Sequence, residues 1–91
     1  MDIYATVINQ IIRQQISVIG SLAMDQAKNV QGLEVVGQNE IHIKGNGKQI
    51  LENLVQEYSR LFGQASVEVC KDAVKEIHPP IPAEYLPQIL V

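Results

Sequence analysis

The sequence contains no tryptophan, one phenylalanine and three tyrosines among 91 residues. With so few aromatic side chains, a core has to be assembled from Ile, Val, Leu and Ala, which packed helix faces readily supply. Cysteine is equally scarce, because Cys70 is the only one, and a single thiol excludes an internal disulfide. The first residues also lack the basic segment and the cleavage site of a secretion signal. We therefore expect a cytoplasmic protein, in which thiols stay reduced.

Long apolar runs and clusters of positive charge are also missing. The most apolar run covers residues 16–24 and includes Ser17, Gly20 and Ser21, whereas a helix needs ~20 apolar residues to cross a bilayer. The seven Lys and Arg residues are scattered singly through a chain with a formal net charge of −3. Nucleic acids are bound by concentrated basic surfaces. The sequence therefore predicts no membrane span and no binding of nucleic acid.

Recognisable patterns for catalysis and for metal binding do not occur. The chain has two histidines, and it contains neither a Cys-x2-Cys nor a His-x3-His spacing. Cys70 and His78 would lie roughly 12 Å apart on a continuous helix, which is too far for both to ligate one metal ion. No serine is arranged with a histidine and an aspartate as in a catalytic triad. We expect no enzyme activity, no metal and no cofactor.

The start of the chain has a clear helical period. Apolar residues recur at spacings of three and four over residues 3–30, which predicts one long amphipathic helix. Asp2 can cap its first turn, and Gly32 is placed as its C-terminal stop. Gly20 falls in the middle of the pattern, where it marks a close approach or a slight bend, or is simply a tolerated glycine.

A β-hairpin is predicted next. Two runs with period-two alternation, residues 33–37 and 41–45, are separated by Gln38-Asn39-Glu40, a short polar segment typical of a hairpin turn. On this interpretation one side of the hairpin is buried and carries Leu33, Val35, Ile41 and Ile43. The outward side carries Glu34, His42 and Lys44, with a register uncertain by one residue.

A second helical pattern begins after the potential N-cap Asn46 and continues from Ile50 to Ile77. The apolar stripe keeps its phase across Gly63, which favours one long helix kinked there over two helices that meet at Gly63-Gln64. The prolines after His78 end the pattern. The domain is therefore predicted as an α-β-β-α unit over residues 1–78, followed by an extended, proline-containing tail, residues 79–91, that docks on the body or on a partner subunit.

The predicted length of the two helices argues for a partner. They would be roughly 40 and 45 Å long, whereas a compact domain of this size has a radius of gyration near 12 Å. A lone two-stranded hairpin also adds little stability. The overall expectation is an α+β fold that forms a helical-bundle homodimer, or that packs against another protein. The residues expected at this interface are Ile8, Ile12, Ile19, Leu54, Tyr58, Leu61 and Val69.

The turn between hairpin and second helix is an alternative site, for a small ligand or an anion. Its residues Gly45, Asn46, Gly47 and Lys48 are similar to the last part of a phosphate-binding loop. The earlier glycine of such loops is missing, and Gln49 stands where Ser or Thr would bind magnesium. We favour a turn with a helix cap.

The second helix also carries carboxylates at spacings of four. Glu68, Asp72 and Glu76 share one helix face, and Lys71 and Lys75 lie beside them. This pattern favours a solvated charged face over an acidic docking stripe or a carboxylate site.

Residues 54–69, an aliphatic and Tyr-containing stretch followed by Gly63-Gln64-Ala65, resemble part of small C-terminal domains of unknown function. Those domains follow receiver, kinase or cyclase modules in bacterial, especially cyanobacterial, signalling proteins. In them an apolar helix is followed by Gly-Pro-x-Ala, and Gln64 replaces that proline here. The resemblance implies a non-catalytic regulatory or oligomerisation role and no site residue. Together with the apolar stripes, it predicts a protein-interaction or homo-oligomerisation module.

Overall fold

The computed structural model describes residues 2–37 and 40–91. Its elements follow in the order α1 (Ile3–Ile19), α2 (Leu22–Ala27), β1 (Leu33–Gly37), β2 (Glu40–Ile43), α3 (Gly47–Phe62), α4 (Gln64–Lys75) and two short 3-10 turns, η1 (Ala83–Tyr85) and η2 (Gln88–Leu90). The α+β fold class predicted from the sequence is confirmed.

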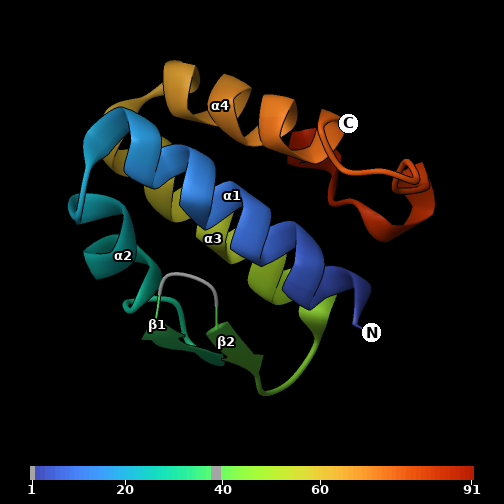
Figure 1. Ribbon diagram of the computed structural model, residues 1–91, viewed down its shortest axis with the longest axis horizontal. Helices are drawn as coiled ribbons and strands as arrows, with labels where there is room; N and C mark the ends of the chain where they lie inside the picture. Colours follow the sequence, from blue (N-terminus) through green and yellow to red (C-terminus); the bar gives the residue numbers. More distant parts are fainter. Residues whose placement is uncertain (1, 38–39) are drawn as a thin grey trace.

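The central element of this fold is α1, which contacts α2, α3, α4 and β2. Figure 1 shows α1 lying in front of α3, with α4 across the top and the hairpin below. The buried face of α1 consists of Val7, Ile8, Ile11, Ile12 and Gln15. No helix within the described ranges has both the length and the apolar character needed to cross a membrane.

The predicted first helix is wrong beyond Ile19, because Gly20 ends α1. Gly20 has φ 70° and ψ −152°, a conformation that is essentially restricted to glycine. Its N–H still donates to the carbonyl of Ile16 at 2.8 Å, and the chain then turns into α2. That short helix ends at Ala27, so Gly32 does not act as its stop. The apolar spacing continues across Gly20 because both helices face the same core.

The favoured interpretation of the second helical pattern is also wrong, since two helices meet at Gly63. This glycine has φ 79° and ψ −167°, and its N–H donates to the carbonyl of Ser59 at 2.8 Å. The chain reverses there, and α4 packs against both α3 and α1. The N-caps predicted for the two patterns are confirmed, because Asp2 accepts from the N–H of Tyr4 and Asn46 accepts from the N–H of Gln49.

The two breaks give a molecule much shorter than two continuous helices would produce. Its radius of gyration is 11.5 Å and its extents are 28 × 26 × 20 Å. The length argument for an obligatory partner therefore fails. Ile8, Ile12, Leu54 and Tyr58, which were expected at an interface with a partner, are at most 1% exposed and form the core of the single chain. Their apolar surface is removed from water by the folding back of α2 and α4.

The hairpin register agrees with the sequence pattern. Leu33 is opposite Ile43 and Val35 is opposite Ile41, with an irregularity between Val35 and Gly37. Leu33 and Ile41 are buried and Val35 and Ile43 are half-buried, while the outward side carries the exposed Glu34, His42 and Lys44. Two residues of the predicted turn, Gln38 and Asn39, lie outside the described residues.

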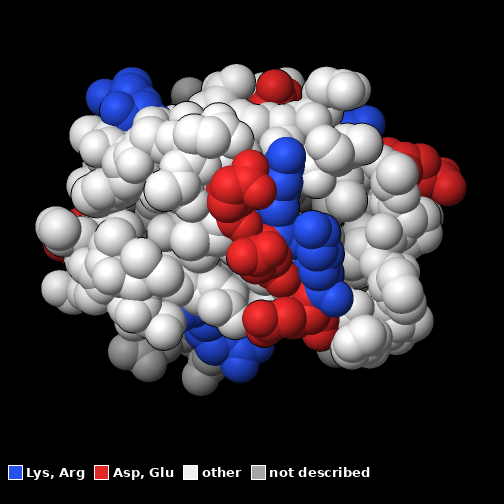
Figure 2. All heavy atoms as spheres, turned by 90° about the horizontal axis from the view of Figure 1, so that it is seen from above, with Lys and Arg blue, Asp and Glu red and all other residues white. Residues whose placement is uncertain are grey.

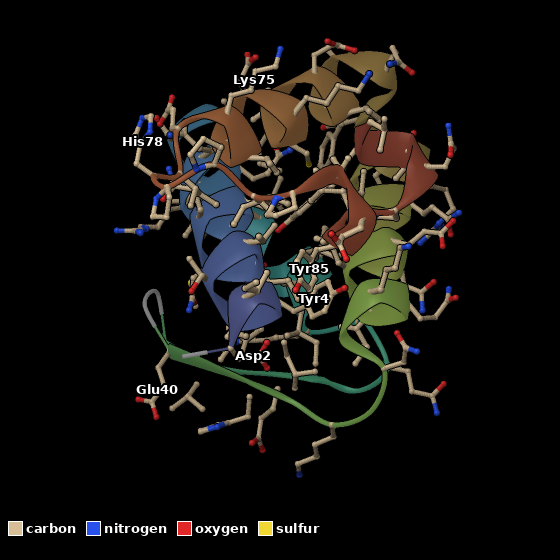
Figure 3. All side chains as sticks on the ribbon, turned by 90° about the vertical axis from the view of Figure 1, so that its right-hand side faces the viewer. Asp2, Tyr4, Glu40, Lys75, His78 and Tyr85 are labelled. Atoms are coloured by element: carbon tan, nitrogen blue, oxygen red, sulfur yellow. The ribbon has the colours of Figure 1, made fainter. Side chains whose placement is uncertain are left out.

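Residues 79–91 lie along the body of the molecule. Leu90 is buried, and Ile81, Leu86 and Ile89 pack against the core. Two contacts hold the first part of this segment in place. The Lys48 ammonium donates to the carbonyl of Glu84 at 3.4 Å, and the rings of Tyr4 and Tyr85 meet edge to face with centroids 6.3 Å apart (Figure 3).

Candidate interaction surface

The predicted anion-binding turn is occupied by structural contacts. The Asn46 side chain caps α3 by accepting from the N–H of Gln49 at 3.0 Å. Gly47 lies so close to the Tyr4 ring that a Cβ there would approach Tyr4 Cδ2 to 2.5 Å. Lys48 reaches toward Glu84 rather than over the helix start. These contacts support a turn with a helix cap, as the sequence pattern favours.

A buried polar cluster joins α1 to α4. The Gln15 side chain is fully buried, and its Nε2 donates to the carbonyl of Ser66 at 3.0 Å and to Cys70 Sγ at 3.3 Å. Gln15 Oε1 is buried and has no hydrogen-bond partner among the described residues. Burial raises the pKa of the Cys70 thiol to about 11, although the hydrogen bond from Gln15 lowers it. A thiol with so high a pKa is a poor nucleophile at neutral pH, so Cys70 is a core residue.

The raised pKa of Cys70 predicts a loss of stability in alkali. In the unfolded chain this pKa is near its ordinary value of 9.0 and in the fold it is about 11, so the unfolded state loses its proton first. The contribution of Cys70 to the free energy of unfolding is fully present below pH 9. It falls by about 2–3 kcal/mol as the pH rises from 9 to 11. Urea unfolding of the reduced protein at several pH values measures the fall.

Cys70→Ala is the control for this measurement, because it removes the titrating thiol. Burial also raises the pKa of Tyr58, which contributes a further loss above pH 10 in both proteins. From pH 9 to 10, any difference in how steeply the free energy of unfolding of the two proteins falls with pH is therefore due to Cys70 alone. Equal slopes would contradict the assignment.

The carboxylates of α4 form a solvated face. Glu68, Asp72 and Glu76 are exposed, and Glu68 lies 3.8 Å from the Lys71 ammonium. Figure 2 shows acidic and basic side chains as two adjoining rows on the upper face of the molecule. In the parts of the chain that are described, no three His, Cys, Asp or Glu side chains gather as a metal ion would require. The pattern of carboxylates is a charged helix surface, the interpretation that the spacing favours.

Large apolar side chains are exposed at the end of the molecule where the helices break. Val18 is 61%, Leu22 49% and Leu61 44% exposed. Figure 1 shows the turn from α1 to α2 and the turn from α3 to α4 together at the left-hand end. We call the exposed surface of Val18, Leu22 and Leu61, with the half-buried Ile19 and Phe62 beside them, the corner surface.

Two buried hydrogen bonds connect the helices at this end of the molecule. The Tyr58 hydroxyl, in the last turns of α3, donates to the carbonyl of Ala23 near the start of α2 at 2.8 Å. The bond from the Gln15 side chain to the carbonyl of Ser66 connects α1 to α4. This bond lies near the end of α1 and the beginning of α4.

The corner surface also lacks charge. Residues 17–22 and 61–66, which form the two turns, contain no Asp, Glu, Lys or Arg. Two of the residues predicted at an interface, Ile19 and Leu61, lie here, whereas Val69 is half-buried on α4. The sequence interpretation missed Val18 and Leu22. A usable signal was the pair of uncharged stretches that surround the two glycines.

Comparison of the chain with protein-family models, with curated proteins and with solved structures gives no match. The case for a function therefore depends on the geometry described above.

Proposed function

We propose that this chain is a non-catalytic module that associates with a second copy of itself through the corner surface. The observation that carries the proposal is the exposure of three large aliphatic side chains, Val18, Leu22 and Leu61, in two turns that contain no charged residue. Single exposed aliphatic residues are ordinary on protein surfaces, but a group of them in one place is typical of an interaction site.

A two-fold axis through the corner surface would place it against the same surface of the second copy. Both sides would then bury aliphatic side chains and exclude water without leaving a charge unpaired, because the two turns contain none. The resemblance of residues 54–69 to small domains of signalling proteins points toward the same kind of role. We also propose a cytoplasmic location, which the unpaired, buried thiol of Cys70 supports.

Glutamate substitutions at the corner surface test this proposal. Val18→Glu and Leu61→Glu each place a charge where the two copies would meet, and an unpaired buried charge is strongly unfavourable. We expect each variant to weaken dimerisation by about tenfold or more. Sedimentation velocity over a concentration series measures the dissociation constant, and circular dichroism verifies the fold.

Val36→Glu is the matched control, since Val36 is 57% exposed but lies on β1, away from the two turns. It should leave the dissociation constant unchanged. A wild-type chain that sediments as a monomer throughout the concentration series would refute the proposal. Equal weakening by all three substitutions would show that the corner surface is not the interface.

A further inference from the structure

A second surface feature, separate from the corner surface, is a groove between α4 and the C-terminal segment. Its volume is about 440 Å³, within the 300–1,000 Å³ range of small-molecule sites. Apolar residues line it from both walls, and two lysines of α4 stand at its rim. The principal lining residues are Val74, Ile81, Leu86, Leu90, Lys71 and Lys75.

The far wall of the groove is a segment held firmly against the body. Leu90 is buried beside α4, and the turn η1 just before Leu86 is tied down by the Lys48 bond to Glu84 and by the packing of Tyr85 on Tyr4 (Figure 3). The apolar floor therefore exists before any ligand binds. A preformed site avoids the entropy cost of ordering a loop on binding.

The two lysines give the groove its charge. Lys71 and Lys75 are one helical turn apart and so lie on the same side of α4. The Lys71 side chain is only 28% exposed, and its hydrocarbon stem extends the apolar lining. None of the lining residues, which also include Pro80 and Val91, has an acidic side chain.

Neither lysine is strongly bound to a carboxylate. Lys71 has one surface ion pair, to Glu68 at 3.8 Å, and such pairs contribute little. Lys75 has no ion pair with any other described residue. Figure 2 shows the basic row on the right of the acidic row, the side on which Figure 1 places the C-terminal segment. Because Lys71 and Lys75 both line the groove, their ammonium groups are available to an anion bound there.

We propose that this groove binds a free anionic amphiphile, a single alkyl chain that ends in a carboxylate. The alkyl chain would lie along Val74, Leu86 and Leu90, with each buried methylene contributing about 0.8 kcal/mol at most. The carboxylate would accept hydrogen bonds from Lys71 and Lys75, which are stronger than bonds between neutral groups. The corner surface has the apolar side chains but no cation, so it does not offer this combination.

Decanoate, used below its micelle concentration, is the probe for this site. We expect saturable chemical-shift changes of the Val74, Leu86 and Leu90 methyl groups in NMR titrations of the full chain. Decanol has the same chain without the charge, and butyrate has the charge with a short chain. Decanol should bind about tenfold more weakly than decanoate, because it loses a charge-assisted hydrogen bond. Butyrate should also bind more weakly, because it lacks most of the methylene groups that the groove would bury.

Variants of the two rim lysines distinguish binding at this groove from non-specific adsorption of the probe. The double substitution Lys71→Gln and Lys75→Gln should weaken decanoate about tenfold and leave decanol unchanged. The matched control, Lys28→Gln with Lys44→Gln, changes the net charge equally on exposed lysines of the hairpin side and should have no effect on either probe.

Three results would overturn the proposal. One is equal affinity for decanoate and decanol. Another is a set of shift changes confined to Val18, Leu22 and Leu61, which would show that the probe only coats the corner surface. The third is co-sedimentation with anionic phospholipid vesicles without any binding of free decanoate, which would identify a membrane surface as the ligand. Because the Lys71 and Lys75 changes lie outside the corner surface, failure here leaves the dimerisation result unaffected.

Discussion

Replacing Tyr58 with alanine is expected to lower the free energy of unfolding by about 3–5 kcal/mol, the range for removal of a large aromatic side chain from a core. Tyr58 is the largest of the fully buried side chains. It also ties α3 to α2 through the 2.8 Å hydrogen bond from its hydroxyl to the carbonyl of Ala23. Alanine would leave a cavity and remove this link. Urea denaturation followed by circular dichroism measures the change.

Tyr58→Phe is the matched control, because it keeps the ring and removes only the hydroxyl. It should cost about 1 kcal/mol, the net contribution of a typical hydrogen bond. If Tyr58→Ala cost no more than Tyr58→Phe, the ring would not be part of the core. That result would reopen the interpretation, made from the sequence, that Tyr58 meets a partner.

Features that depend on near neighbours in the chain were predictable. The caps at Asp2 and Asn46 depend on one side chain and a backbone N–H two or three residues later. The hairpin register follows from the alternation of Leu33, Val35, Ile41 and Ile43, because a shift by one residue would expose all four. Each of these features is decided within a few residues.

The path of the helices could not be predicted in the same way. Periodicity reports which side chains are buried, but it does not report whether consecutive turns belong to one axis. At Gly20 and Gly63 the apolar phase continues while the axis changes, because the helices on both sides face one core. A tolerated glycine and a glycine with positive φ look identical in the sequence.

The same ambiguity explains why some of the residues predicted at an interface are in the core of the single chain and others are near its surface. Ile8 and Ile12 belong to one apolar stripe with Ile19, yet only Ile19 remains near the surface, because α4 covers the stripe as far as the turn at Gly63. The sequence predicts how much apolar surface a helix carries. Whether the same chain or a second one covers it is decided by where the helices break.

The two glycines therefore offer a decisive test of the fold. Alanine at Gly20 or Gly63 would have to adopt a backbone conformation that costs about 1–3 kcal/mol. Apart from its chain neighbours, a Cβ at either position would meet no atom of the described residues within 4 Å. The cost is thus conformational rather than steric. Since the two changes are local to separate turns, the double variant should be destabilised by about 2–6 kcal/mol. Urea denaturation of both single variants and of the double variant measures each contribution.

Gly37→Ala is the matched control. Gly37 also has open space around it, but its φ is not positive, so alanine there should change stability by less than about 0.5 kcal/mol. Alanine favours a continuous helix by about 1 kcal/mol over glycine. The double variant therefore also tests the fold predicted from the sequence, in which each helical pattern forms one continuous long helix. If it were as stable as the wild type, with a larger sedimentation frictional ratio, the two long helices would be an accessible fold. Loss of stability would establish that the positive φ at Gly20 and Gly63 is required for α2 and α4 to turn back onto the core. The same two turns leave Val18, Leu22 and Leu61 at the surface.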